Sequence, residues 1–314
     1  MGQGRVAPVP AGRSAAVRRP APVGRIAYVN GRYVPHGEAC VHVEDRGYQF
    51  ADGVYEVVYL TGGALLDEDR HLDRLERSLG ELRIAPPMGR AALRRVLREV
   101  ARRNRVRDGL LYMQVTRGVA RRDHAFPPPG TPPALVVTAR RLPPFPRDVG
   151  RWAVRAITRP DERWARCDIK SVALLPNVLA RQAARDQGVF EAILIGRDGV
   201  VTEGASTTVW IVDEAGVLRT RPLDRAVLPG CTRDALIALM REDGVCFEER
   251  AFDATELRRA REVFLTSATG FVKPVVSLDG VPVGGGEVGP VTRRLFGLFA
   301  GHVRDGRDTG RDTA

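Results

Sequence analysis

Lysine is nearly absent from this chain of 314 residues. Of its 49 basic residues only Lys170 and Lys273 are lysines, and all the others are arginines. Arginine can replace lysine wherever only positive charge matters, but its guanidinium keeps its proton and forms no Schiff base, whereas a desolvated lysine amine can lose its proton and form one. Each remaining lysine is therefore either a leftover surface charge or a nucleophilic amine.

Cysteine is also scarce, and long apolar runs are missing. Cys40, Cys167, Cys231 and Cys246 lie far apart, with no CxxC pair and no Cys/His ligand spacing. This argues against a zinc site or any other metal site and favours a reducing compartment. No apolar run reaches the roughly 18 residues of a spanning helix, and the N-terminal segment lacks the apolar core of a signal peptide. We therefore expect a soluble, cytoplasmic protein without membrane contact.

The net charge of +11 suggests nucleic-acid binding until it is located along the chain. Residues 1–25 contain five arginines and no acid, and the last thirteen residues sum to zero. The remaining charge of about +6 is spread over segments that also contain acids, without a basic block or interleaved aromatic residues. We therefore expect no nucleic-acid partner, although a basic binding protein without catalysis stays open as an alternative.

The apolar spacing predicts a mixed α/β protein. With 44% hydrophobic and 28% charged residues the composition is that of a globular chain. A hairpin turn stands at Asn30-Gly31, followed by a turn-rich segment up to residue 53. The elements expected after it are strands at 54–60, 110–116, 134–139, 152–158 and 191–195 and helices at 67–84, 88–104, 177–186 and 289–303.

The length exceeds the about 250–300 residues at which a single core stops growing, so two domains are expected. The best linker is the proline-dense stretch at residues 141–150, because its prolines continue neither a helix nor a strand. The expected divisions are a disordered basic extension at 1–25, a small α/β domain at 26–140, the linker at 141–150, a larger α/β domain at 151–303 and a disordered tail at 304–314.

Three segments carry polar residues in patterns that suit anions. His71 and Arg74 are three residues apart and share one helix face. Gly230 and Thr232 stand at the start of a helix, where free N–H groups bind phosphate, although an ordinary Thr N-cap is the commoner interpretation. A loop from residue 117 to 126 is basic and stiffened by the prolines that follow, which suits an anion trap or a merely exposed loop.

The wording and order of several motifs resemble the fold-type IV pyridoxal-phosphate enzymes, and within that group the D-amino acid aminotransferases. The resemblance covers about residues 26–303, which is nearly everything outside the two tails. The motifs that carry it are DRGYQFADGVYEVV, HLDRL, VTRG…RRDHAFP, RWxRCDIKSxxLLPNVLA, EAIL…VTEGASTTVW and LPGCTRD.

The resemblance implies a site. Lys170 matches the Schiff-base lysine of pyridoxal 5'-phosphate, and Glu203 matches the carboxylate that pairs with the pyridine nitrogen. The other positions implied for the cofactor are Arg74, Leu228, Gly230, Cys231, Thr232 and Ser267. Those implied for the substrate are Tyr55, Arg122, His124 and Ala268. Trp164 matches an aromatic residue near the site without a role in the chemistry, and Lys273, beside Pro274, has no comparable set of partners.

The chemistry requires such a set independently of the family. A carboxylate such as Glu203 keeps the ring nitrogen protonated, so that the ring can take up the electrons left when the α-proton is removed. A neutral Lys170 amine can move that proton. A phosphate dianion needs a cation such as Arg74 and a helix terminus, and fixed cations hold the substrate carboxylate in position.

The resemblance implies transamination between D-amino acids, such as D-alanine or D-glutamate, and 2-oxo acids, such as 2-oxoglutarate or pyruvate. It also implies a homodimer whose partner helps to close the site. The Arg122–His124 pair favours this activity over that of a branched-chain-type L-amino acid aminotransferase. That enzyme and 4-amino-4-deoxychorismate lyase remain alternatives on the same fold. Departures from the pattern are Ala51 in FADG, Pro229 in LPG, and Ala268, which puts side-chain specificity in doubt.

Overall fold

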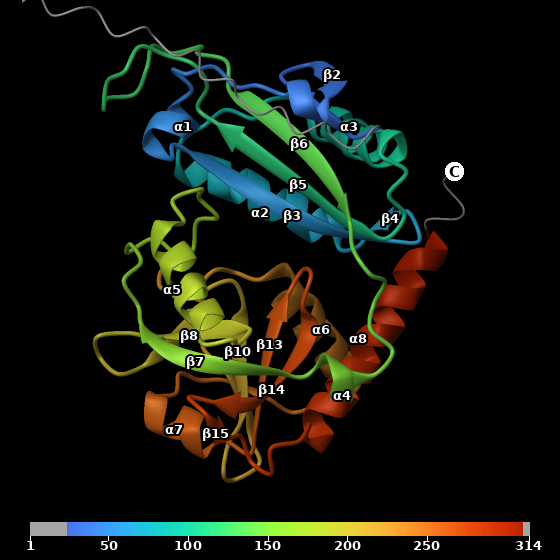
Figure 1. Cartoon of the computed structure of the whole chain (residues 1–314), viewed down its shortest axis with the longest axis vertical. Coiled ribbons are helices and arrows are strands. Elements are labelled where there is room, and N and C mark those ends of the chain that lie inside the picture. Colours follow the sequence, from blue (N-terminus) through green and yellow to red (C-terminus); the bar gives the residue numbers. More distant parts are fainter. Residues whose placement is uncertain (1–23, 310–314) are drawn as a thin grey trace, which may run out of the picture.

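Two β-sheets divide the chain, one above the other in Figure 1. The computed structural model describes residues 24–309, so nearly all of the basic extension expected at 1–25 lies outside it. The first sheet has six antiparallel strands in the order β2-β1-β6-β5-β3-β4. The second has nine strands, mixed parallel and antiparallel, in the order β12-β11-β10-β13-β14-β7-β8-β9, with β15 paired to β14. The predicted mixed α/β class is confirmed.

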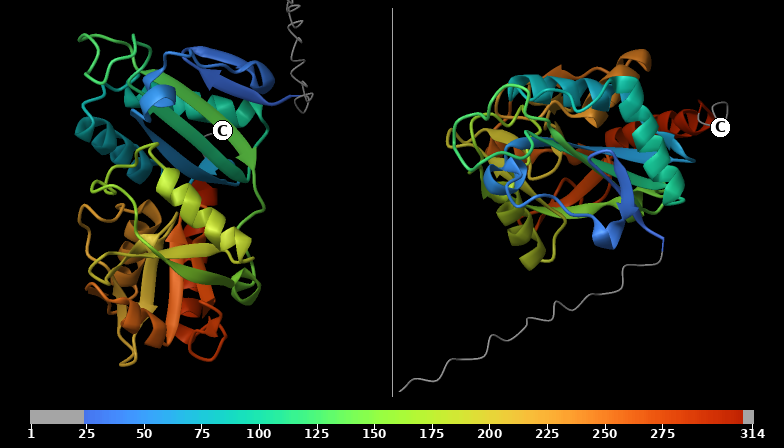
Figure 2. Two further views of the ribbon diagram at one scale, coloured as in Figure 1. Left: turned by 60° about the vertical axis from the view of Figure 1, so that its left-hand side comes forward. Right: turned by 90° about the horizontal axis from the view of Figure 1, so that it is seen from above.

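The first sheet and its helices come from the N-terminal half of the chain, and α2 and α3 cover one face of it (Figures 1 and 2). Its elements are β1 (Ile26–Val29), β2 (Arg32–Pro35), α1 (Arg46–Phe50), β3 (Gly53–Thr61), β4 (Ala64–Leu65), α2 (Glu68–Glu81), α3 (Arg90–Arg103), β5 (Gly109–Thr116) and β6 (Ala134–Arg141).

The second sheet comes from the C-terminal half. Its strands are β7 (Val154–Pro160), β8 (Glu191–Ile195), β9 (Val201–Gly204), β10 (Thr208–Val212), β11 (Leu218–Thr220), β12 (Glu248–Glu249), β13 (Glu262–Ser267), β14 (Phe271–Leu278) and β15 (Val281–Pro282). Its helices are α4 (Val149–Trp152), α5 (Leu175–Asp186), α6 (Cys231–Glu242), α7 (Ala254–Arg259) and α8 (Pro290–Thr309).

Local sequence explains the elements that were predicted best. Asn30 and Gly31 both have positive φ, 45° and 89°, which is the conformation that a two-residue hairpin requires. On α2 the side chains of Leu72, Leu75 and Leu79 recur at helical spacing and are buried in the core between the helix and the first sheet.

The turn-rich segment expected before β3 contains a short helix, α1. Asp45 caps it by accepting a hydrogen bond from the Gly47 N–H. The helix ends at Ala51, which has a left-handed φ of 55°. This position explains why relatives often place glycine there, because glycine adopts positive φ without a steric penalty.

Two of the expected divisions differ from the observed elements. The last helix continues to Thr309, so residues 304–309 are not the disordered tail that was expected at 304–314. Charged residues with good helix propensity can extend a helix beyond its last core contact. The stretch expected as a linker, 141–150, includes the end of β6 and the start of α4. That it separates two domains stays a proposal.

Helix α8 contacts both sheets, running along one flank of the molecule (Figure 1). Its apolar side, which includes Leu295, Phe299 and Val303, is buried in a core with Phe264 and Tyr59, one from each sheet. Within residues 24–309, no helix has both the length and the apolarity to cross a membrane.

The segment that carries Lys170 crosses from the second sheet to the edge of the first. Ser171 forms an isolated β-bridge with Val54, and the Val172 N–H donates to the Gly53 carbonyl at 3.0 Å. On that side of β3, strand β4 pairs only with the far end, which leaves this part of the edge to the Lys170 segment. The pairing places Lys170 where the two sheets meet.

Candidate active site

A cavity of about 480 Å³ is lined by side chains from both sheets. This volume is within the range of about 300–1,000 Å³ that is usual for small-molecule sites. The predicted site residues that line it are Tyr55, Arg74, Lys170, Glu203, Leu228, Gly230, Cys231, Thr232, Ser267 and Ala268, together with Trp164. The sequence prediction therefore named a set that the fold brings to one place.

Lys170 is held rigidly at its backbone, while its amine faces an aromatic ring. The Lys170 N–H donates to Ser78 Oγ at 3.2 Å, and its carbonyl accepts from the Tyr55 N–H at 3.0 Å. The Nζ atom lies 4.3 Å from the centroid of the Tyr55 ring. A backbone fixed on both sides leaves the side chain alone to move within the cavity.

Ion pairs on α2 hold the same segment in place. Arg77 donates from one nitrogen to the Asp168 carbonyl at 2.8 Å and from another to the Asp168 carboxylate at 2.7 Å. Arg166 binds the same carboxylate at 2.9 Å and also pairs with Glu81. The conspicuous Arg166 and Asp168 of the RCDIKS motif therefore fix the lysine rather than line the cavity.

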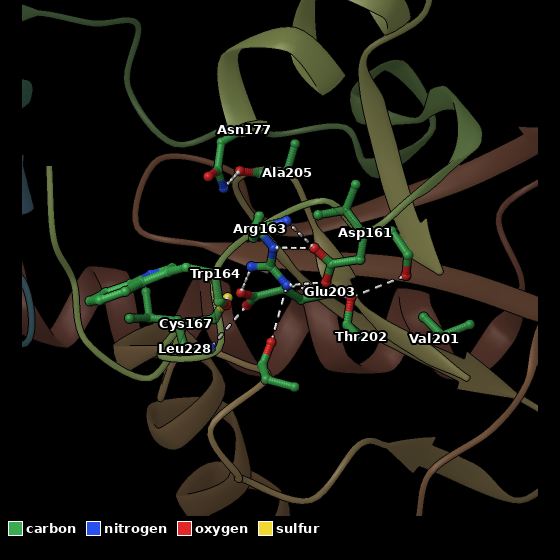
Figure 3. A network of polar contacts seen from close by, with 12 residues as sticks. Asp161, Arg163, Trp164, Cys167, Asn177, Val201, Thr202, Glu203, Ala205 and Leu228 are labelled. Carbon is green, nitrogen blue, oxygen red and sulfur yellow. Dashed lines mark hydrogen bonds and ion pairs between the residues drawn. The ribbon is translucent and has the colours of Figure 1, made fainter. Parts of the chain in front are cut away.

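Glu203 is buried and its two carboxylate oxygens are both occupied (Figure 3). Arg163 pairs with Oε1, and the Leu228 N–H donates to Oε2 at 3.2 Å. Burial raises the pKa of Glu203 above its ordinary value, while the Arg163 charge and the charge of Lys170 act in the opposite direction. Arg163 is therefore the group that favours the ionised carboxylate in a dry site.

Arg163 is itself fixed by a second carboxylate (Figure 3). It donates to Asp161 at 2.7 Å and to the Ala226 carbonyl at 3.0 Å, and Asp161 accepts a further bond from the Thr202 hydroxyl at 2.6 Å. Only 5% of the Arg163 side chain is exposed. The chain Asp161–Arg163–Glu203 thus places a fixed negative charge at the cavity wall.

The start of α6 lines another part of the cavity. Gly230 is the N-cap of the helix and no side chain caps it, so Thr232 is not the ordinary cap that its position suggested. The first-turn N–H groups of a helix have no intrahelical partner and carry partial positive charge. Together with the Thr232 hydroxyl they form a site suited to a phosphate group.

Arg74 lies next to this helix start and is tied to a buried carboxylate. It donates to the two oxygens of Glu56 at 2.7 and 2.8 Å and to the Pro229 carbonyl at 2.9 Å. Burial alone would raise the pKa of Glu56, but Arg74 and His71 lower it to about 2. Glu56 is therefore ionised, and it holds Arg74 beside the helix start.

His71 adds a second cation to this group. Its Nδ1 lies 2.8 Å from Glu56 Oε2. Burial alone would lower the pKa of His71, but its contacts with Cys231 and Glu56 raise it to about 9. At neutral pH the three side chains His71, Arg74 and Glu56 therefore carry a net charge of +1, which favours an anion at the start of α6.

Two of the predicted substrate residues are not at this cavity. Arg122 and His124 are exposed on the loop between β5 and β6, which extends beyond the sheet at the upper left of Figure 1. Both pack on the Phe50 ring, and Arg46 donates to the carbonyls of Asp123 and His124. Within one copy of the chain, therefore, they do not face Lys170.

Lys273 differs from its expectation in the other direction. The sequence offered it no partners, yet it lines the same cavity as Lys170. Its side chain is buried in β14, with Nζ 3.0 Å from the Trp152 ring centroid and 4.6 Å from that of Phe190. Both lysines of the chain thus reach one site.

Sequence reasoning missed five polar residues of the site. Glu56, Asp161 and Arg163 had no signal beyond their place inside the quoted motifs, and His71 was noted only as a neighbour of Arg74. Lys273 had the signal of lysine scarcity, which did not say where it would lie. Within residues 24–309, no group of three or more His, Cys, Asp or Glu side chains is arranged to hold a metal ion.

The residues present fit pyridoxal phosphate. The uncapped start of α6 with Arg74 suits its phosphate, Glu203 held ionised by Arg163 suits a protonated ring nitrogen, and an amine is available at Lys170. These three groups line one cavity, so a single ligand that carries an anionic end, a basic ring nitrogen and an aldehyde can satisfy all of them.

Comparison with known proteins gives the same result. The family model described as amino-transferase class IV matches residues 53–278. A D-alanine aminotransferase of Bacillus licheniformis is 45% identical over 267 residues, which are 85% of this chain and 93% of that protein. A D-alanine aminotransferase of Listeria innocua is 40% identical over 280 residues, 88% of this chain and 95% of that protein.

A solved structure supports both fold and cofactor. A branched-chain amino acid aminotransferase from the organism abbreviated T.th., solved with pyridoxamine 5'-phosphate, superimposes with a TM-score of 0.80 at 27% identity, covering 89% of this chain and 94% of that one. The predicted fold-type IV relationship and the predicted cofactor are thereby confirmed. The chain belongs to the amino-transferase class IV family and is a pyridoxal-phosphate-dependent aminotransferase.

Proposed function

We propose that this enzyme moves an amino group between D-amino acids, such as D-alanine and D-glutamate, and 2-oxo acids, such as pyruvate and 2-oxoglutarate. The observation that carries the proposal is that Lys170 and the Arg163–Glu203 pair line one cavity. The preference for D-amino acids is supported by relatives of 40–45% identity named D-alanine aminotransferase, against 27% for the branched-chain structure.

Each group of the site has a separate task in this reaction. Pyridoxal phosphate, when bound, supplies an aldehyde that takes up the amino group and a ring that takes up the electrons left at the substrate α-carbon. Lys170 removes the α-proton and returns a proton on the other side of the transfer. Glu203, kept ionised by Arg163, holds a proton on the ring nitrogen through its negative charge.

Other residues hold the cofactor and exclude water. Arg74 and the first-turn N–H groups of α6 bind the phosphate with charge-assisted hydrogen bonds, and Leu228 packs beside the ring. Tyr55, Ser267 and Ala268 line the space that is left for the substrate. Fixing donor and cofactor in one dry cavity supplies the orientation that this proton transfer requires.

Replacing Arg74 with methionine is expected to weaken cofactor binding by about 10–100-fold, the usual effect of losing a hydrogen bond to a charged group. It also leaves the fully buried Glu56 with His71 as its remaining cation, so the free energy of unfolding should fall by about 3–5 kcal/mol. Cofactor titration and thermal unfolding measure the two effects. Arg70→Met, on the same helix but about a third exposed, is the matched control, and an equal loss in that variant would contradict the assignment.

We further propose a cytoplasmic homodimer in which the Arg122–His124 loop of one copy closes the cavity of the other. The loop is exposed, cationic, and held away from its own cavity by Arg46. Exposed apolar side chains gather around it, and they mark an interface: Val41, Val43, Tyr48, Val119 and Phe126.

Subunit mixing tests this arrangement. Lys170→Ala and Arg122→Met should each be nearly inactive alone, but an equal mixture allowed to exchange subunits should regain about one quarter of the wild-type sites, because one site of each mixed dimer is then intact. Recovered activity is measured with D-alanine and 2-oxoglutarate. If the mixture stays as inactive as its components, the loop does not act across subunits.

The activity itself is tested with paired D- and L-amino acid donors and added cofactor. We expect transfer from D-alanine and D-glutamate. Transfer from L-leucine or L-valine with none from the D-amino acids would overturn the proposal in favour of a branched-chain-type enzyme. Release of pyruvate and 4-aminobenzoate from 4-amino-4-deoxychorismate would indicate the lyase instead.

A further inference from the structure

Lys273 is a buried amine without a counter-charge. The residue is 4% exposed, and within residues 24–309 no carboxylate lies within ion-pair distance of its Nζ. Burial with no opposing effect lowers the pKa of this amine to about 7. Burying an unpaired ammonium is unfavourable, and the contact with the Trp152 ring offsets that only in part.

Space filling alone does not account for this residue. A methionine has nearly the same length and shape and would occupy the same position between two aromatic rings without a charge to desolvate. The chain has also replaced lysine with arginine almost everywhere else. An amine at this position is therefore explained best by an anion that arrives with a ligand and pairs with it.

The cavity identifies which anion this is. The phosphate already has Arg74 and the start of α6, and the substrate α-carboxylate has the Arg122–His124 loop under the proposed function. Another cation at this end, Arg181, is already paired with the Glu191 carboxylate at 3.1 Å. Lys273 is left for a further negative group, and the rings of Trp152 and Phe190 beside it suit the methylene groups that would lead to such a group.

We propose that Lys273 forms a subsite for the side-chain carboxylate of a dicarboxylic substrate, either an amino acid or its 2-oxo acid. The inference rests on the proposed function for the reaction, and it deepens that function by naming the residue that accepts the second carboxylate. Lys273 is then a specificity residue, because a substrate with an apolar side chain does not use its charge.

Binding of unreactive acids to the cofactor-loaded enzyme tests this subsite directly. Glutarate and pentanoate have five carbons each and differ by one carboxylate. We expect Lys273→Met to weaken glutarate binding, measured by calorimetry, by about 10–100-fold, the usual loss for a charge-assisted hydrogen bond, and to change pentanoate binding by less than about threefold on the same scale. Lys273→Arg should keep part of the glutarate preference.

Single-turnover amino transfer gives a second measurement. In Lys273→Met the apparent KM for D-glutamate should rise by about the same factor, while the apparent KM for D-alanine stays close to the wild-type value. Arg140→Met is the rival control, since Arg140 is an exposed cation that lines the same cavity. Equal losses for both acids in Lys273→Met, unchanged glutarate binding, or a selective loss in Arg140→Met instead would each overturn the subsite.

The two proposals fail in different ways. A wild-type enzyme that transfers from neither D-alanine nor D-glutamate contradicts the proposed function, whereas glutarate and pentanoate binding still decides the role of Lys273. An enzyme that uses both D-amino acids but shows no selective glutarate loss in Lys273→Met keeps its function and contradicts the subsite.

Discussion

Replacing Lys170 with alanine should lower the rate of amino transfer by at least about 10⁴-fold, the upper end of the range for a positioned proton-transfer group. Lys170 is the amine held by Ser78 and Tyr55 at the junction of the two sheets, and it both holds the cofactor and moves the α-proton in our account. Stopped-flow absorbance during a single turnover with D-alanine measures the rate. The visible band of the lysine-bound cofactor should also disappear.

Lys170→Arg is the matched control for this experiment, because it keeps the positive charge and most of the length but forms no Schiff base. We expect it to be as inactive as the alanine variant. A Lys170→Arg enzyme with substantial activity would mean that the position supplies charge alone, which contradicts the role given to the amine.

Replacing Glu203 with glutamine should lower the rate of amino transfer by about 10²–10³-fold, the size of effect seen when one fixed electrostatic group is removed. The substitution keeps the shape of the side chain and its contact with the Leu228 N–H, but it removes the negative charge that keeps the ring nitrogen protonated. The rate at saturating donor separates this effect from weaker binding.

Arg163 provides the control for the Glu203 prediction. Since burial already raises the pKa of Glu203, weakening its cation with Arg163→Lys should raise that pKa further. The acid limb of the rate profile should then move to higher pH, because Glu203 must be ionised to act. In the double variant the Glu203→Gln loss should dominate, with little added by Arg163→Lys. Fully additive losses would show that the two residues act separately.

Much of the fold follows from local sequence. The Asn30-Gly31 hairpin needs two residues that tolerate positive φ, and α2 needs leucines at helical spacing, and both signals lie within a few neighbouring residues. The course of the segment at residues 170–172 is different. Its pairing with the edge of β3 joins residues more than a hundred positions apart, and no local pattern encodes that contact.

The site divides in the same way. Lys170 and Glu203 were found through lysine scarcity and family motifs, but the pairing of Glu203 with Arg163 was not, because one arginine cannot be distinguished among so many until the fold brings it to a carboxylate. The same holds for Glu56, which looks like an ordinary strand residue and yet holds both Arg74 and His71.

Lys273 and the Arg122–His124 pair show the limits most clearly. Lys273 follows a turn and precedes a proline, and only strand pairing in β14 turns it into the wall of the cavity. Arg122 and His124 were assigned to the substrate by resemblance, and in a single copy they are exposed. Their partner, in our proposal, is a second chain, which no sequence pattern of one chain reveals.

Reduction of the enzyme with borohydride in the presence of pyridoxal phosphate, followed by mass analysis of proteolytic peptides, tests the central claim most directly. The chain has two lysines, so the label has two possible side chains. The account predicts a phosphopyridoxyl group on the peptide that contains Lys170 and none on the peptide that contains Lys273. A label on Lys273 alone, or on neither peptide, would contradict it.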